Sequence, residues 1–296
     1  MLKGRYLKAV ASAPGKIILT GEHFVVYDEP AIVMAINLGV QVTVENRSDG
    51  NIYASSNLGF SGTFIGDKFK PEKGGLESQE ILAPIRIAVE TVFKTLNKKQ
   101  GINIKVHSDL PIAVGLGSSG ALAVATVAST GRFLGTEFTK KEIVDLAFES
   151  EKHVHLHPSG IDQTISTYGG VIVYEKNKGI SRLNIGHTIP LIIGNTGIIR
   201  NTGKLVDTVR DKKETVPKVM IPLIHTAGQL TKQAIAALKN GNLKQLGELM
   251  NMNHGLLVAI GVSTDSLDIL VNAANKAGAL GAKLTGAGGG GSAARR

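Results

Sequence analysis

Residues 115–120 read Gly-Leu-Gly-Ser-Ser-Gly, and they open an almost wholly apolar stretch, residues 120–134, that is expected to be a helix. Glycines let the backbone turn sharply and approach a ligand closely, and a helix N-terminus supplies unpaired N–H groups and a partial positive charge. The two serines add hydroxyls for hydrogen bonds or for a magnesium ion. The stretch therefore predicts a phosphate-binding loop. A glycine-rich helix entry packed against a neighbour is the purely structural alternative.

The same stretch fits the pattern G-x-G-x-x-G, which many dinucleotide-binding domains use to hold the pyrophosphate. That fold needs a second strand, ending in an acidic residue, after the helix. Here an amphipathic helical pattern over residues 139–153 follows instead. The phosphate-binding pattern that ends in Gly-Lys-Ser/Thr is also missing from this loop. Both of these nucleotide-binding folds are therefore disfavoured.

Hydrophobic periodicity around the loop predicts a mixture of strands and helices. Apolar and polar residues alternate over 40–45 and over 102–106, as in half-buried strands. Residues 78–98 repeat apolar side chains at helical spacing, with Pro84 early in the helix, where a missing N–H costs little. Strands mixed with helices first, then mostly helices, predict an α+β fold of two lobes, divided near residues 180–190. The other expected elements are strands at 170–176 and 190–195 and helices at 217–239, 242–260 and 264–277.

Composition narrows the class of protein. Of 296 residues, 43% are hydrophobic and 19% are charged, which is the balance of a globular protein. The sequence has no apolar run of roughly 18 residues, no signal peptide and no cysteine, so a cytoplasmic location is expected. The net charge of +9 suits anionic substrates, and aromatic residues at 4% leave few rings for stacking on bases. A catalytically inactive nucleotide- or nucleic-acid-binding protein is the alternative from another class.

Two further segments combine glycines with polar side chains. Residues 13–23 read Ala-Pro-Gly-Lys-Ile-Ile-Leu-Thr-Gly-Glu-His. Lys16 is expected between a Pro-Gly turn and an apolar strand, where a fixed ammonium can neutralise phosphate charge. An ordinary lysine at a strand start is the alternative. Residues 283–292 read Lys-Leu-Thr-Gly-Ala-Gly-Gly-Gly-Gly-Ser, and a strand expected at 282–285 favours a structured loop over a flexible tail.

The three segments in this order resemble the GHMP kinase family, named for galactokinase, homoserine kinase, mevalonate kinase and phosphomevalonate kinase. The resemblance covers nearly the whole chain, and it is closest to the mevalonate kinases. Lys16 followed by Gly-Glu-His at 21–23 is similar to their first motif. Residues 157–162, His-Pro-Ser-Gly-Ile-Asp, followed by Ser-Thr-Tyr-Gly-Gly at 166–170, are similar to their catalytic-aspartate segment.

This resemblance implies a fold and an activity. The implied fold has an N-terminal ribosomal-protein-S5-like α/β lobe over residues 1–185 and a mostly helical, ferredoxin-like C-terminal lobe over residues 186–296, with the cleft between them. The implied reaction is the ATP- and Mg2+-dependent phosphorylation of the 5-hydroxyl of mevalonate in isoprenoid biosynthesis, with other acceptors of the family as alternatives. A homodimer is compatible with it. The implied ATP-binding residues are Gly115, Leu116, Gly117, Ser118, Ser119, Gly120, Gly286 and Gly288.

The resemblance also implies roles for the reacting groups. Asp162 would accept the proton of the acceptor hydroxyl, and Lys16 would keep Asp162 ionised and offset charge on the moving phosphoryl group. An aspartate at a helix N-terminus is the structural alternative for Asp162. Ser119 and Glu151 would be the magnesium ligands, although Glu149 stands two residues away and is an alternative.

Four residues are implied as the mevalonate-binding set, namely Glu22, His23, Thr202 and Arg200. Arg200 would pair with the substrate carboxylate, and a surface arginine is the alternative. Family members usually continue after their third motif, which residues 283–292 resemble here, with a further strand and helix, whereas this sequence ends at Arg296.

Three alternating histidines also suggest metal binding, namely His153, His155 and His157. In a strand their side chains would share one face. Because they straddle a helix end and a Pro-Ser-Gly turn, no transition-metal site is expected there.

Overall fold

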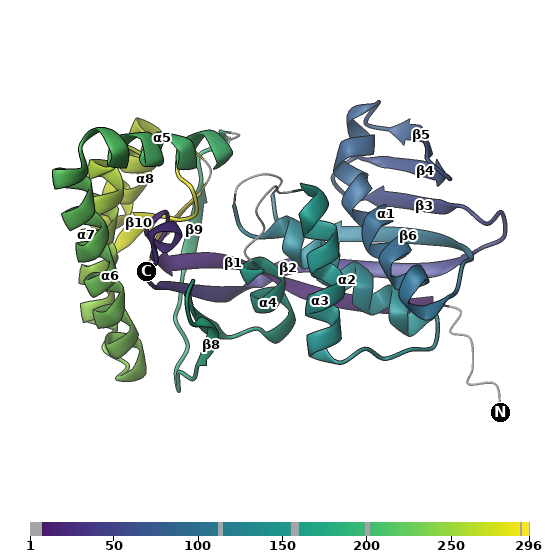
Figure 1. Cartoon of the computed structure of the whole chain (residues 1–296), viewed down its shortest axis with the longest axis horizontal. Coiled ribbons are helices and arrows are strands. Elements are labelled where there is room, and N and C mark those ends of the chain that lie inside the picture. Colours follow the sequence, from purple (N-terminus) through teal and green to yellow (C-terminus); the bar gives the residue numbers. More distant parts are fainter. Residues whose placement is uncertain (1–7, 112–114, 155–159, 199–201, 291, 296) are drawn as a thin grey trace. The chain divides into compact units, whose positions relative to one another are not determined.

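The structure, a computed structural model, describes residues 8–111, 115–154, 160–198, 202–290 and 292–295 (Figure 1). Its internal contacts divide the chain into two compact units that each combine separate segments. These units are not contiguous in the sequence, because the second unit also takes in Lys16–Ala35. The contiguous lobes expected at 1–185 and 186–296 stay a prediction. The first unit comprises Met1–Gly15, Ile36–Pro111 and Gly117–Gly169, and the second comprises Lys16–Ala35, Ile112–Leu116 and Gly170–Arg296.

The first unit is built on a sheet with the strand order β5-β4-β3-β6-β2, in which β1 also pairs with β2. Among the pairs β2–β6, β3–β4, β3–β6 and β4–β5, only β3 and β6 run parallel. Val40, Val42 and Val44 are buried along β2, so the alternation in the sequence marks the face that is covered. The strands are β1 (Lys8–Thr20), β2 (Ala31–Arg47), β3 (Ile52–Ser56), β4 (Ser61–Ile65), β5 (Lys68–Lys73) and β6 (Gly101–Ser108).

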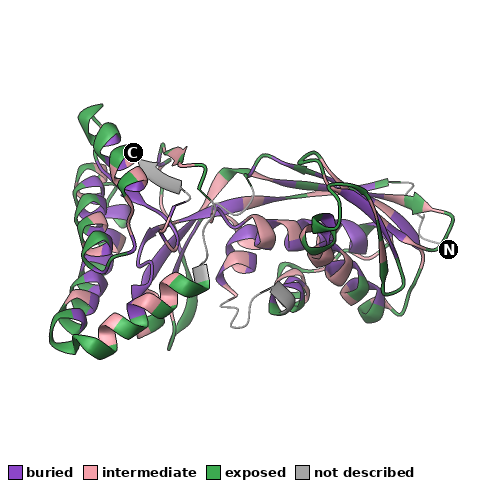
Figure 2. Ribbon diagram, turned by 90° about the horizontal axis from the view of Figure 1, so that it is seen from above, coloured by how far each residue is buried: buried purple, intermediate pink, exposed green. Residues whose placement is uncertain are grey.

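Helices of the first unit lie together on one face of this sheet (Figures 1 and 2). They are α1 (Glu77–Leu96), α2 (Ser118–Phe133), α3 (Lys140–Val154) and α4 (Ile161–Tyr168). The helix α2 packs against α1, α3 and α4, which is why most of its residues are buried and most of these are apolar or small. This packing fixes the start of α2, at the glycine-serine loop, close to the start of α4.

The second unit has two sheet regions and a group of helices. The first residues of β2 pair with β7 (Val171–Glu175), which pairs with β8 (Gly179–Leu183). A separate antiparallel sheet has the order β10-β11-β9. Its strands are β9 (Ile192–Asn195), β10 (Ala282–Leu284) and β11 (Ser292–Arg295), and the helices are the short η1 (Phe24–Tyr27), α5 (Thr202–Thr215), α6 (Pro217–Lys239), α7 (Leu243–Ala259) and α8 (Asp265–Lys276).

The core of the second unit forms between these helices and β10. Phe24 of η1, Leu257 of α7, Leu267 of α8 and Leu284 of β10 are each fully buried in one apolar cluster. The cluster thereby joins the end of the first motif to the strand that opens the third motif. No helix in the described ranges combines the length and the apolar content that a membrane span needs.

One local expectation from the sequence is wrong. Pro14 and Gly15 form no turn, because both lie inside the continuous strand β1. A Cβ placed on Gly39 of β2 would lie 3.2 Å from Cα of Pro14, so the two strands run in close contact at this point. Proline is tolerated in a strand where its missing N–H is not needed for the sheet. Lys16 therefore projects from the middle of a strand rather than from its start.

Candidate active site

The glycine-serine loop, residues 115–120, runs into α2, which begins at Ser118. Gly115 and Gly117 have φ angles of 82° and 73°, the left-handed region that favours glycine, and Gly117 is the N-cap residue of α2. A glycine cap brings no side chain to the first turn, and no side-chain hydrogen bond caps this helix. Ser118 and Ser119 are half-buried in that turn. The loop therefore has the backbone geometry of an anion site at a helix N-terminus.

Gly120 brings this loop against the predicted catalytic aspartate. A Cβ placed on Gly120 would lie 2.8 Å from Cβ of Asp162, which is closer than side chains pack. Asp162 lies in the first turn of α4, after Gly160, whose φ of 73° makes it a left-handed N-cap residue. The structure thus joins two segments that the sequence analysis treated separately, the phosphate loop and the aspartate segment.

The two predicted magnesium ligands lie beside one small cavity. Ser119 and Glu151 line a space of about 10 Å³, together with Gln163 and three other residues. Glu151 is 9% exposed and its Oε2 accepts a hydrogen bond from Nε2 of Gln163. Glu149, the alternative, is about half exposed and pairs with Lys152 at 2.6 Å. The geometry therefore favours Glu151 over Glu149.

Gln163 was missed in the sequence analysis. Its side chain is fully buried, and Oε1 has no hydrogen-bond partner among the described residues. The amide must turn its NH₂ group to the carboxylate of Glu151, so the oxygen faces the other way. The sequence offered one sign of Gln163, a polar side chain next to the predicted catalytic aspartate. Its hydrogen-bond partner Glu151 lies twelve positions away, so no local pattern showed the pair.

The part of β1 that belongs to the second unit begins at Lys16. The backbone N–H of Lys16 donates to the carbonyl of Leu116 at 2.8 Å, which ties the first motif to the start of the phosphate loop. The Lys16 side chain is 8% exposed, whereas Ile17 beside it is fully buried. The lysine is therefore held in place, as the sequence analysis expected.

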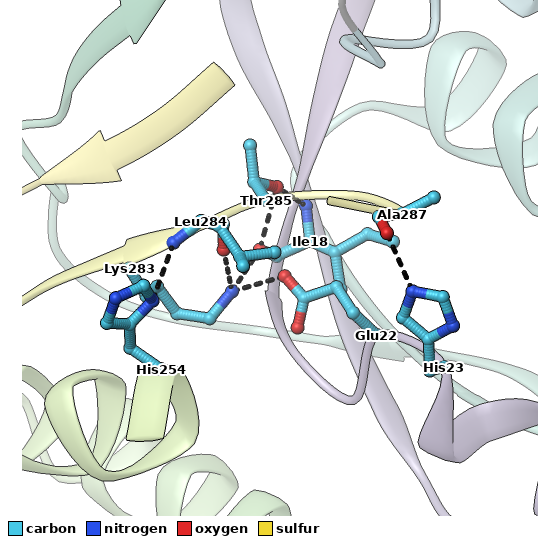
Figure 3. Close-up of polar contacts among 8 residues, drawn as sticks. All are labelled: Ile18, Glu22, His23, His254, Lys283, Leu284, Thr285 and Ala287. Carbon is cyan, nitrogen blue, oxygen red and sulfur yellow. Dashed lines mark hydrogen bonds and ion pairs between the residues drawn. The ribbon is translucent and has the colours of Figure 1, made fainter. Parts of the chain in front are cut away.

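Glu22 and His23 follow the end of β1 and face the third motif (Figure 3). Nζ of Lys283 donates to Oε1 of Glu22, and Nε2 of His23 lies 2.8 Å from the carbonyl oxygen of Ala287. His23 has a φ of 59°, which is strained for a residue with a side chain. Such strain persists only where the surrounding structure fixes it, and it is common at functional sites.

The third motif is a folded loop rather than a flexible tail. Oγ1 of Thr285 accepts from the backbone N–H of Ile18 at 3.0 Å and donates to its carbonyl at 3.1 Å. Gly286 and Gly288 have φ angles of 77° and 78°. A Cβ on Gly288 would lie 2.0 Å from the carbonyl oxygen of Val262, so packing already requires glycine there. The role of both glycines in ATP binding stays a prediction.

Burial shifts the pKa values of the Glu22–Lys283 pair in opposite directions. Loss of solvent raises the pKa of the Glu22 carboxyl above its ordinary value, and the Lys283 ammonium opposes that shift. Loss of solvent lowers the pKa of Lys283, and Glu22 opposes it. Lys283 stands in the quoted third motif, but its partner lies 261 positions away, so spacing alone gave no sign of the pair.

Several predicted residues cannot be placed. Arg200, His155 and His157 lie outside the described residues, and the side chains of Thr202 and His153 are not described. Thr202 begins α5. In the part of the chain that the structure does describe, no three His, Cys, Asp or Glu side chains gather as a metal site would require.

Comparison with known proteins identifies the family. Residues 84–170 match the GHMP kinases N terminal domain, and residues 234–294 match the GHMP kinases C terminal domain. The chain belongs to the GHMP kinase family. A mevalonate kinase of Thermococcus sibiricus is 40% identical over 96% of this chain and 88% of the relative. A mevalonate kinase of Pyrococcus horikoshii is 41% identical over 95% of this chain and 86% of the relative.

Solved structures of GHMP kinases have the same fold. The crystal structure of L. major mevalonate kinase in complex with R-mevalonate matches with a TM-score of 0.86 and 30% identity, covering 100% of this chain and 89% of that one. The crystal structure of the Methanococcus jannaschii mevalonate kinase matches with a TM-score of 0.79 and 25% identity, covering 99% and 91%. The family and the α+β fold expected from the sequence are therefore confirmed.

Proposed function

We propose that this GHMP kinase transfers the γ-phosphoryl group of ATP to the 5-hydroxyl of mevalonate. The observation that carries the proposal is the close approach of Gly120, in the first turn of α2, to Asp162. This contact supports the proposal, because a helix start that binds phosphate would then lie next to a carboxylate that accepts the proton. The relatives named mevalonate kinase and the matching structure with R-mevalonate support this acceptor.

ATP is held in this proposal through its phosphates. The turn of Gly115 and Gly117 leaves the first N–H groups of α2 for phosphate oxygens, and the helix dipole favours the negative charge. The hydroxyls of Ser118 and Ser119 add donors at the same turn. Gly286 and Gly288 complete the proposed nucleotide-binding set in the third motif.

The residues at the small cavity suit magnesium. A hard cation prefers oxygen ligands, and the cavity offers the Ser119 hydroxyl and the Glu151 carboxylate. Gln163 also lines the cavity, and its Nε2 donates to Oε2 of Glu151. Ser119 and Glu151 would hold the ion, which when bound neutralises charge on the ATP phosphates. Gln163 would orient Glu151.

In the proposed reaction, the 5-hydroxyl oxygen of mevalonate bonds to the γ-phosphorus while the bond from that phosphorus to the bridging oxygen breaks and ADP leaves. The hydroxyl proton passes to the Asp162 carboxylate. Lys16 offsets negative charge on the transferring group. Glu22 and His23 hold the substrate, and Thr202 and Arg200 belong to the same proposed set.

The test is an acceptor screen. ADP release should depend on both mevalonate and Mg2+, and product NMR should find phosphorus on the 5-oxygen. Phosphomevalonate, homoserine and galactose serve as controls, since other GHMP kinases act on them. Turnover with one of these acceptors and none with mevalonate would overturn the substrate while keeping the family.

A further inference from the structure

Lys283 is a fully buried ammonium on β10 whose hydrogen bonds are all directed at fixed acceptors. Nζ donates to Oε1 of Glu22, to the carbonyl oxygen of Leu284 at 2.5 Å and to that of Ile18 at 3.5 Å (Figure 3). An ammonium has three N–H donors, so these acceptors use all of them. Lys283 therefore has no donor left for a ligand, and its position is determined by the protein.

An apolar side chain at position 283 could make the folded protein at least as stable as this lysine does. Removing an ammonium and a carboxylate from water is expensive, and apolar side chains of similar volume often replace a buried ion pair at no loss of stability. The neighbouring buried positions of β10, Ala282 and Leu284, are apolar. A charged pair at Lys283 and Glu22 thus calls for a reason other than stability.

The second carboxylate oxygen of Glu22, Oε2, indicates a role in ligand binding. Oε1 is taken by Lys283, whereas Oε2 is buried and has no hydrogen-bond partner among the described residues. Glu22 as a whole is 1% exposed, so bulk solvent does not satisfy this oxygen. A buried acceptor without a donor is unfavourable, which points to a donor that a ligand brings. The strained backbone of His23 stands directly beside it.

We propose that Lys283 is a positioning residue that holds Oε1 of Glu22 so that Oε2 accepts a hydrogen bond from a hydroxyl of the acceptor alcohol. The inference rests on the proposed function, because it takes the acceptor of that reaction as the ligand. Lys283 itself touches no substrate; it acts only through Glu22.

The charges around Glu22 give the proposal a pH signature. Burial raises the pKa of the Glu22 carboxyl, and the charges that lower it are Lys283 on β10 and, more weakly, Lys16 on β1. His23 is the next residue along the chain, and His254 of α7 faces Lys283. Without Lys283, Glu22 takes up a proton more readily, and a protonated carboxyl accepts hydrogen bonds poorly. Loss of the ammonium should therefore weaken acceptor binding most at low pH.

The test compares Lys283→Met with the unaltered enzyme. We expect KM for the acceptor to rise tenfold or more, while KM for ATP stays within twofold. In the variant, KM for the acceptor should fall again as the pH rises, a trend that should be weaker in the unaltered enzyme, where Lys283 opposes protonation of Glu22. Lys212→Met is the matched control, because Nζ of Lys212 also donates to a carbonyl, that of Ile260 at 2.9 Å, without contacting Glu22. It should leave both KM values unchanged.

A second comparison covers the case in which Lys283→Met does not fold. Glu22→Gln removes the carboxylate, and the double variant Glu22→Gln with Lys283→Met removes both charges. If Lys283 acts through Glu22, the double variant has the same acceptor KM as Glu22→Gln alone. A further rise in the double variant, or a Lys283→Met enzyme with lower Tm but normal acceptor KM and pH profile, would overturn the inference.

Failure of the proposed function is seen in a different measurement. It appears in the unaltered enzyme, as turnover with another acceptor and none with mevalonate. The ratio of variant to unaltered KM is then measured with the acceptor that the enzyme does use, and it decides the role of Lys283. An enzyme that uses no acceptor overturns both proposals.

Discussion

Asp162 is the residue whose replacement separates chemistry from binding. Asp162→Asn keeps the shape that packs against Gly120 but cannot take up the acceptor proton. We expect kcat to fall by about 10²–10⁴-fold, the usual contribution of a general base. ATP affinity, measured by calorimetry, should stay near normal because α2 is unchanged. Asp145→Asn, at an exposed aspartate of α3 that pairs with Lys141, is the control and should keep full turnover. Loss of ATP binding with Asp162→Asn would assign the residue a structural role.

Gln163 offers a test of the proposed magnesium site that does not depend on turnover. Its Nε2 fixes one oxygen of Glu151 inside the core of the first unit. Gln163→Leu removes that donor at similar volume, and loss of such an orienting partner typically weakens metal binding about 10–100-fold. Titration with Mn2+ followed by EPR, in the presence of a nucleotide, measures the affinity directly. Gln79→Leu, at an exposed position of α1, should leave it unchanged. Equal affinities in both variants would remove Gln163 from the site.

At the scale of the element, the first turn of α2 carries a conflict between helix stability and packing. Gly120 and Gly255 are both helical glycines, and alanine normally stabilises a helix interior by about 0.5–1 kcal/mol relative to glycine. Gly255 of α7 has open space around it, so Gly255→Ala should give that gain. Gly120→Ala should instead destabilise the protein by about 1–3 kcal/mol, because the new methyl meets Asp162. Urea unfolding of the two variants measures both; a stabilising Gly120→Ala would contradict the contact.

Elements with a strong periodic pattern could be predicted from the sequence, and elements without one could not. The helix expected at 217–239 is found at Pro217–Lys239, since apolar residues repeat along it and proline opens it. The strand β8, Gly179–Leu183, was not predicted, because it pairs only with β7 in the described sheet and four of its five residues are exposed. An edge strand of this kind needs no apolar alternation. Pro14 and Gly15 were read as a turn because the sequence does not show that β1 passes through them.

At the scale of the whole molecule, the contacts that join distant segments were the least predictable. Motifs in the sequence made Glu22 and Asp162 candidate site residues, but did not show that Lys283 and Gly120 would be their neighbours. Such pairs arise when the chain folds back on itself, and no local pattern records them. The types of residue predict a chemistry, whereas only the tertiary fold determines which residues are paired.

The stability of the whole molecule should depend on His254 in mildly acidic solution. Its Nδ1 accepts from the backbone N–H of Leu284 at 3.4 Å, and its Nε2 lies 3.2 Å from Oδ1 of Asp268. Burial lowers the pKa of His254, with a smaller contribution from Lys283, and this outweighs the opposing effect of Asp268. The neutral ring fits these contacts, because a proton on Nδ1 would face the N–H of Leu284.

The sign of the pH dependence follows from that shift. Below the ordinary histidine pKa of about 6.5 the unfolded chain binds a proton at this position more readily than the native protein does. The contribution of His254 is therefore complete above about pH 6.5 and is lost as the pH falls toward the native pKa, with a slope of at most about 1.4 kcal/mol per pH unit. Urea unfolding between pH 5 and 8 should show a steeper loss of stability for the unaltered protein than for His254→Gln. Above pH 7 the two curves should run parallel; parallel curves over the whole range would show that His254 does not couple protonation to folding.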